Sequence, residues 1–130
     1  FHFNVDLAQG PCVIKRLRGC GAGCEYVAIT PEGDIYPCHQ FVGNPDYKLG
    51  NLDEGTFDMG ISGEFAALNI YTREECQHCW ARFYCSGGCS ASNLLVNGDI
   101  KKPHHVGCAL ERKRLECAIA LKAIAAGMAE

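Results

Sequence analysis

The sequence predicts a small α+β domain, with a β-hairpin near its start, short helices in its middle and a long helix at its end. Three observations predict this fold class. The chain has 130 residues, which is enough for one domain. β-branched and aromatic residues surround a turn at residues 31–34, and apolar residues recur at helical spacing over 106–127. The composition, 48% hydrophobic and 21% charged, excludes a disordered chain.

The hairpin is the first regular element that we expect. Residues 26–30 and 35–38 flank a turn that contains Gly33, and the second strand would present Cys38 at its end. Residues 43–46 predict a loop, and residues 49–52 predict a short strand.

Helices follow the hairpin. Apolar residues within 64–73 predict a short helix, and residues 76–89 predict a metal-bound loop with about one helical turn. Residues 90–96 predict a helix that the Asn97-Gly98 pair ends. The clearest pattern covers residues 106–127, where leucine and isoleucine alternate with charged residues.

Charge and hydropathy limit the partners. The net charge of −3 argues against nucleic acid or an anionic membrane surface, both of which favour basic proteins. No apolar run approaches the roughly 20 residues of a membrane-spanning helix. The chain begins with Phe1 and shows no signal peptide, so we expect a cytoplasmic protein and a part of a longer chain.

Ten cysteines are the outstanding feature of the composition. Their even number is compatible with a disulfide framework. The close pairs Cys20-x3-Cys24 and Cys76-x2-Cys79 are compatible with structural zinc, although a second site would then be needed for Cys38, Cys85, Cys89 and Cys108. The third interpretation is an iron–sulfur cluster, whose thiolate ligands lie on loops with varied spacing.

The spacing of the central cysteines favours iron and sulfur. The run Cys76-x2-Cys79-x5-Cys85-x3-Cys89 is followed by Cys108. It differs from the bacterial ferredoxin run C-x2-C-x2-C-x3-C-P, because the gap before Cys85 is too long and Ser90 replaces the proline.

These spacings resemble the SPASM domain, the C-terminal auxiliary-cluster domain of radical SAM peptide-modifying enzymes. Its pattern is C-x(9–15)-G-x4-C, a gap, C-x2-C-x5-C-x3-C, a second gap and a last cysteine. All seven cysteine positions fit, with Gly33 at the glycine, over about residues 12–117. The resemblance divides the chain into a leading segment, residues 1–19, which follows a radical SAM part, and an auxiliary-cluster domain, residues 20–130.

Within this family, the local amino-acid sequence resembles that of the maturases of the SCIFF peptides. Those enzymes install thioether links from a peptide cysteine sulfur to another residue's α-carbon. The resemblance rests on four stretches: 19–23, 36–43, 79–89 and 97–100. Sulfatase-maturing relatives carry an aspartate after the cysteine that matches Cys38, where this chain has His39. We therefore expect thioether formation rather than sulfatase maturation.

The resemblance also implies the ligands of two [4Fe–4S] clusters around which the domain is organised. One cluster takes Cys76, Cys79, Cys85 and Cys108, and the other takes Cys20, Cys38 and Cys89. The fourth position of the second cluster stays open between Cys12, which we favour, Cys24 and a substrate thiol. His39 is a candidate to donate a hydrogen bond to cluster sulfur, with a packing role as the alternative.

No catalytic residue is expected in this chain, because it lacks the C-x3-C-x2-C triplet that holds S-adenosyl-L-methionine (SAM) and a third [4Fe–4S] cluster in the family. Those belong to the rest of the parent enzyme. The resemblance implies that this domain binds the thiol of a cysteine-rich, ribosomally made precursor peptide, or accepts an electron and passes it to a ferredoxin or flavodoxin. The alternative is a cysteine-rich zinc module that docks a peptide and uses its metals only for structure.

Overall fold

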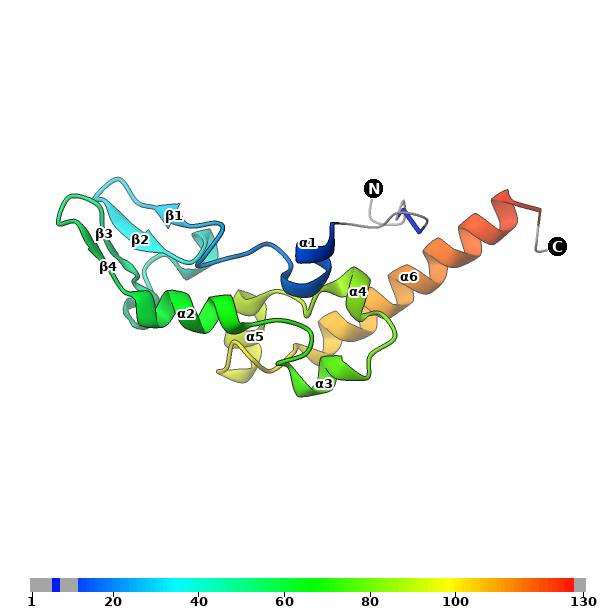
Figure 1. The fold of residues 1–130 in the computed structure, drawn as a ribbon. Coiled ribbons are helices and arrows are strands. Elements are labelled where there is room, and N and C mark those ends of the chain that lie inside the picture. The colour runs from blue at the N-terminus through cyan, green and yellow to red at the C-terminus, as the bar shows by residue number, and fades with distance from the viewer. Residues whose placement is uncertain (1–5, 8–11, 128–130) are drawn as a thin grey trace.

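An antiparallel sheet of four short strands lies at one end of the molecule, and helix α6 extends away at the other (Figure 1). The computed structural model describes residues 6–7 and 12–127. The strands pair in chain order and are β1 (Ala28–Ile29), β2 (Asp34–Tyr36), β3 (Gly50–Asn51) and β4 (Thr56–Phe57). The predicted α+β class is confirmed.

The predicted hairpin is confirmed as β1 and β2. Ala28 lies opposite Tyr36, and Ile29 lies opposite Ile35. The predicted strand at 49–52 is β3, which pairs with β2. Strand β4 was not expected, because its two residues are too few to show an alternating pattern.

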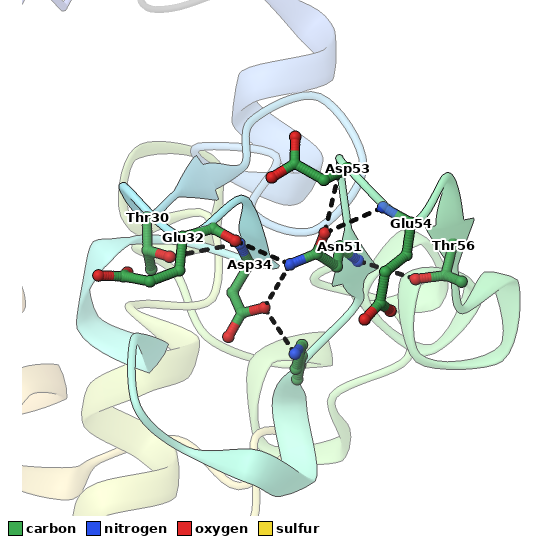
Figure 2. A network of polar contacts seen from close by, with 8 residues as sticks. Thr30, Glu32, Asp34, Asn51, Asp53, Glu54 and Thr56 are labelled. Atoms are coloured by element: carbon green, nitrogen blue, oxygen red, sulfur yellow. Dashed lines mark hydrogen bonds and ion pairs between the residues drawn. The ribbon is translucent and has the colours of Figure 1, made fainter.

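A network of polar contacts around Asn51 joins the two turns of the sheet (Figure 2). The Asn51 side chain is buried, and its Nδ2 donates to the Glu32 carbonyl oxygen over 2.9 Å and to Asp34 Oδ1 over 2.8 Å. Its Oδ1 accepts from the backbone N–H groups of Asp53 and Glu54. The 31–34 turn is thereby held against the 52–55 turn.

The remaining regular elements of the described chain are helical. They are α1 (Val13–Arg18), the 3-10 turns η1 (His39–Phe41) and η2 (Pro45–Tyr47), α2 (Met59–Ala67), α3 (Glu74–Gln77), α4 (Arg82–Cys85), α5 (Ser90–Asn97) and α6 (His105–Ala125). The predicted helices at 90–96 and 106–127 are confirmed as α5 and α6. The predicted loop at 76–89 contains parts of two single-turn helices, α3 and α4.

The helix predicted at 64–73 is wrong in its bounds. Helix α2 begins five residues earlier, because Asp58 Oδ1 accepts from the backbone N–H groups of Gly60 and Ile61 and caps its N-terminus. Two glycines in α2 hid this start from the apolar pattern. The helix ends before Asn69, whose side chain accepts from the N–H groups at positions 71 and 72 and forms a turn instead.

The hydrophobic core lies between the sheet and helices α2 and α5. Phe41, Tyr47 and Phe65 form an aromatic group in which Phe41 lies 4.9 Å from Tyr47 and 5.3 Å from Phe65, between ring centroids. The buried Cys38 belongs to the same core. A ligand candidate is thus held by the best-packed part of the molecule.

Helix α1 is tied to the body by the N–H of Ile70, which donates to the Leu17 carbonyl over 3.0 Å. This helix falls in the leading segment expected at residues 1–19, of which residues 1–5 and 8–11 lie outside the described part. The division at residue 19 stays a prediction. None of the helices in the described ranges combines the length and the apolar character needed to cross a membrane.

Candidate metal centres

Four cysteines from the region of α3, the end of α4 and the start of α6 line one hollow. They are Cys76 in α3, Cys79 just after α3, Cys85 at the end of α4 and Cys108 in the first turn of α6. A backbone hydrogen bond holds the first two close together, because the Cys79 N–H donates to the Cys76 carbonyl over 3.1 Å. The structure brings together the four thiols assigned to one cluster.

A second and more open hollow of ≈ 500 Å³ is lined by the other three thiols. Cys20 follows α1, Cys38 follows β2, and Cys89 directly precedes α5. These positions lie far apart in the sequence, and the core brings them to one place. Cys85 and Glu111 line both hollows, so the two candidate sites adjoin each other.

Residues 20–80 match the family model of the SPASM domain, an iron-sulfur cluster-binding domain. This stretch is a SPASM domain. It includes thiols that line both hollows, while the remaining lining thiols follow the matched stretch at Cys85, Cys89 and Cys108.

Known proteins with similar sequences are maturases. The chain is 33% identical over 87 residues to a serine-type anaerobic sulfatase-maturating enzyme of Klebsiella aerogenes, which covers 64% of the chain and 20% of that enzyme. It is 30% identical over 101 residues to a PqqA peptide cyclase of Xanthomonas euvesicatoria pv. vesicatoria, covering 73% of the chain and 27% of the cyclase. A PqqA peptide cyclase of Xanthomonas campestris pv. campestris is 28% identical over 117 residues, covering 79% and 31%. The chain therefore spans between a fifth and a third of the length of these distant relatives.

The thiols of the first hollow lie in surroundings that disfavour their ionisation. Burial, joined by the nearby thiols of Cys85, Cys108 and Cys79 and opposed by the charge of Arg73, raises the pKa of Cys76 to about 11. Burial also raises the pKa of Cys85 and of Cys108. Coordination to a metal reverses this preference, because the cation stabilises the thiolate. The donor set therefore fits a thiolate-bound metal group.

The surroundings of the second hollow shift the pKa values of two of its thiols in opposite directions. Burial raises the pKa of Cys38, and Cys89 and Cys20 contribute to the rise. Burial also opposes the Cys89 thiolate, but hydrogen bonds from Ser92, Ala91 and Gln40 outweigh it and lower the pKa of Cys89. Cys89 is the thiol of this hollow that is best prepared to be a thiolate.

Gln40 donates a hydrogen bond to sulfur, and the sequence analysis missed it. Its Nε2 lies 3.6 Å from Cys89 Sγ. The predicted donor, His39, lines the same hollow, and its role stays a prediction. Gln40 lies two residues after Cys38, within the 3-10 turn η1. Its closeness in the sequence to a ligand candidate, rather than its residue type, is the signal that could have identified it.

Neither candidate for the fourth ligand lines the second hollow. Cys12 is exposed at the N-cap of α1. Cys24 is exposed, its thiol donates to the Gly21 carbonyl over 3.4 Å, and it shares a separate, smaller hollow with Cys20. The choice among Cys12, Cys24 and a substrate thiol therefore stays open.

Arg73 is a second residue that sequence reasoning missed. Its side chain is only 4% exposed, and its Nη2 donates to Ser90 Oγ over 3.0 Å. Its Nη1 is buried and has no hydrogen-bond partner within the described residues. Nothing in the local sequence separates this arginine from a surface arginine, because its burial arises from tertiary packing.

Proposed function

We propose that the chain is the auxiliary-cluster part of a radical SAM enzyme that installs thioether cross-links in a cysteine-rich, ribosomally made peptide. The observation that carries this proposal is the gathering of seven cysteines at two adjoining hollows, with Cys85 lining both. Cys76, Cys79, Cys85 and Cys108 line the first, and Cys20, Cys38 and Cys89 line the second. Each hollow would hold one [4Fe–4S] cluster.

The spacing of the thiols supports a cluster over a single zinc ion. Among the described residues, no three His, Cys, Asp or Glu side chains are close enough together to bind one ion. The thiols of the first hollow surround a space, and a multi-iron cluster needs its cysteines around it in this way. The buried, unpartnered Nη1 of Arg73 also favours an anionic group nearby.

The second hollow supports a role in substrate binding. Besides Cys85, which also lines the first hollow, it is lined by three thiols, and it is the more open of the two, so a peptide cysteine has room to approach. When bound there, a cluster with an open iron would hold a substrate thiolate and exchange single electrons. Gln40 holds Cys89 through its hydrogen bond, and the buried backbone around Cys38 fixes the opposite side.

The relatives support a substrate that is a protein or a peptide, since their names describe maturation of a sulfatase and cyclisation of the peptide PqqA. His39 stands where sulfatase-maturing relatives of the SPASM family carry an aspartate, which favours thioether formation. The electron partner would be a ferredoxin or flavodoxin. SAM and a third [4Fe–4S] cluster would belong to the rest of the parent enzyme.

The test is a metal analysis of the chain, purified and reconstituted without oxygen. About eight iron and eight sulfide per chain are expected, as two [4Fe–4S] clusters require. About two zinc with negligible sulfide would overturn the proposal and favour the zinc-containing docking module.

The fourth ligand of the second cluster is tested by Cys12→Ala and Cys24→Ala. The variant that lacks a true ligand should lose the signal of one cluster, whereas the other variant serves as its matched control. If both variants keep eight iron and a thiol-containing peptide perturbs the spectrum of one cluster, the substrate supplies the fourth ligand.

A further inference from the structure

Arg73 is a buried cation close in the fold to both candidate metal sites, although it lines neither hollow. Its Nη2 donates to Ser90 Oγ, and Ser90 directly follows Cys89 of the second site. Its backbone carbonyl accepts the N–H of Cys76 of the first site over 2.9 Å. Arg73 therefore contacts the chain next to a ligand candidate of each set.

The electrostatic surroundings of Arg73 contain thiols of both sites. Burial lowers the pKa of Arg73, and the charges of Cys76, Cys85, Asp99 and Cys89 oppose this effect. Two of these residues line the first hollow, and Cys89 lines the second. The guanidinium group is thus close enough to both sets of thiols to act on each.

Gly87 leaves space for Arg73. A Cβ atom at this position would lie 3.1 Å from Arg73 Cδ and 3.2 Å from Nε, and the backbone φ of +87° favours glycine as well. The segment that joins Cys85 to Cys89 is therefore shaped around this side chain.

No carboxylate among the described residues forms an ion pair with Arg73, although the charge of Asp99 acts on it without a direct contact. A buried charge without a partner is strongly destabilising. Thiolate-bound [4Fe–4S] clusters are anions, and the reduced state carries one more negative charge than the oxidised state. Clusters in the two hollows would supply the missing counter-charge from both sides.

On the basis of the proposed function, we propose that Arg73 is a shared counter-charge that raises the reduction potentials of both clusters together. A positive charge near a cluster stabilises the state with the extra electron. The electron comes from a one-electron donor, dithionite in the assay, and leaves to an acceptor of the same class. Arg73 acts on the clusters through its positive charge and does not touch the substrate.

The test is a redox titration, followed by electron paramagnetic resonance, of the full-length parent enzyme. The ligands of its third cluster are replaced by alanine so that only two clusters contribute. Arg73→Met removes the charge and keeps an unbranched side chain. The reduction potential of each cluster should fall by at least about 59 mV. For a one-electron couple this is about a tenfold change in the ratio of reduced to oxidised cluster.

Two variants serve as controls. Arg73→Lys keeps the charge and should keep both potentials near those of the wild type. Lys122→Gln removes a cation roughly 21 Å along α6 from Cys108, at 1.5 Å per residue, and should shift neither potential. A shift of one couple only, or of neither, in Arg73→Met would overturn the inference.

Loss of metal in a variant is also decisive. If Arg73→Met fails to take up iron while Arg73→Lys takes up both clusters with unchanged potentials, the charge of Arg73 is required to bind the clusters rather than to set their potentials, and the inference fails. If both variants lose the clusters, the shape of the guanidinium group is what matters and the inference fails. A wild-type enzyme without the two clusters would instead refute the proposed function, and the inference with it.

Discussion

Replacing Phe41 with alanine should destabilise the domain and disturb the second metal site. Phe41 is 2% exposed and stands at the centre of the aromatic group formed with Tyr47 and Phe65. Its N–H donates to the Cys38 carbonyl over 3.0 Å. The ring therefore supports the segment that carries a ligand candidate.

The expected magnitude follows from its burial. Truncation of a buried phenylalanine to alanine costs about 3–5 kcal/mol, through lost apolar burial and a residual cavity. Small domains are stable by only about 5–15 kcal/mol, so this loss is a large fraction of the total. With a urea dependence of about 2 kcal/mol per molar, the midpoint of unfolding should fall by about 2 M.

The assay is anaerobic urea unfolding of the metal-loaded chain, followed by circular dichroism and by visible absorption. Phe57→Ala is the matched control, because Phe57 is 45% exposed on strand β4 and its loss should change stability by about 1 kcal/mol or less. In Phe41→Ala, iron should leave the second site at lower urea than the first. Equal midpoints for the two variants would refute the assignment of Phe41 to the core that supports Cys38.

Three further variants test other parts of the structure. Lys48 hydrogen-bonds to Asp34 and lowers the pKa of that carboxyl, so Lys48→Met should be less stable than wild type at pH 7. This difference should shrink as the pH falls through the folded pKa of Asp34, below its ordinary value of 3.8, and a pH-independent difference in thermal midpoint would contradict the ion pair. Gly50→Ala should destabilise the β3–β4 pairing, because a Cβ there would overlap the backbone of the opposite strand, and an unchanged urea midpoint would refute this. Cys108→Ser should lose one cluster while Cys117→Ser, on the same helix, keeps about eight iron, and equal iron contents would exclude Cys108 as a ligand.

The parts of the fold that local sequence determines were predictable. The turn at 31–34 and the regular apolar spacing of α6 are local features, and both elements were found where expected. Helix α2 was misplaced because Asp58 and Asn69 define its ends through side-chain hydrogen bonds, which hydrophobic periodicity does not detect. Strand β4 was missed because only its pairing with β3 defines it.

The candidate site was predictable to a different extent. Cysteine spacing, together with the family resemblance, separated the thiols into the two groups that the structure places in two hollows. The surrounding charge and hydrogen bonding were not predictable, because Arg73 is buried by tertiary packing and Gln40 reaches Cys89, 49 residues away in the sequence, only in the folded chain. Cysteine spacing identifies the residues that can bind a metal, whereas tertiary packing determines which other side chains act on those ligands by charge or hydrogen bonding.

The order of the ligand candidates along the chain has a consequence for folding. The first group spans residues 76–108 and the second spans 20–89, so the two loops that they close overlap at 76–89. Metal binding would therefore join the segment near α1, the sheet and the start of α6 at once, and restrict an unfolded chain over most of its length. Several large apolar side chains of α6 are exposed in the described structure, including Leu110, Leu121 and Ile124, and only Leu115 and Ala118 of its described residues are buried, so packing holds this helix through a small contact. Coordination through Cys108 would then be the main restraint on α6, and removal of iron should release that helix before it disrupts the aromatic core around Phe41.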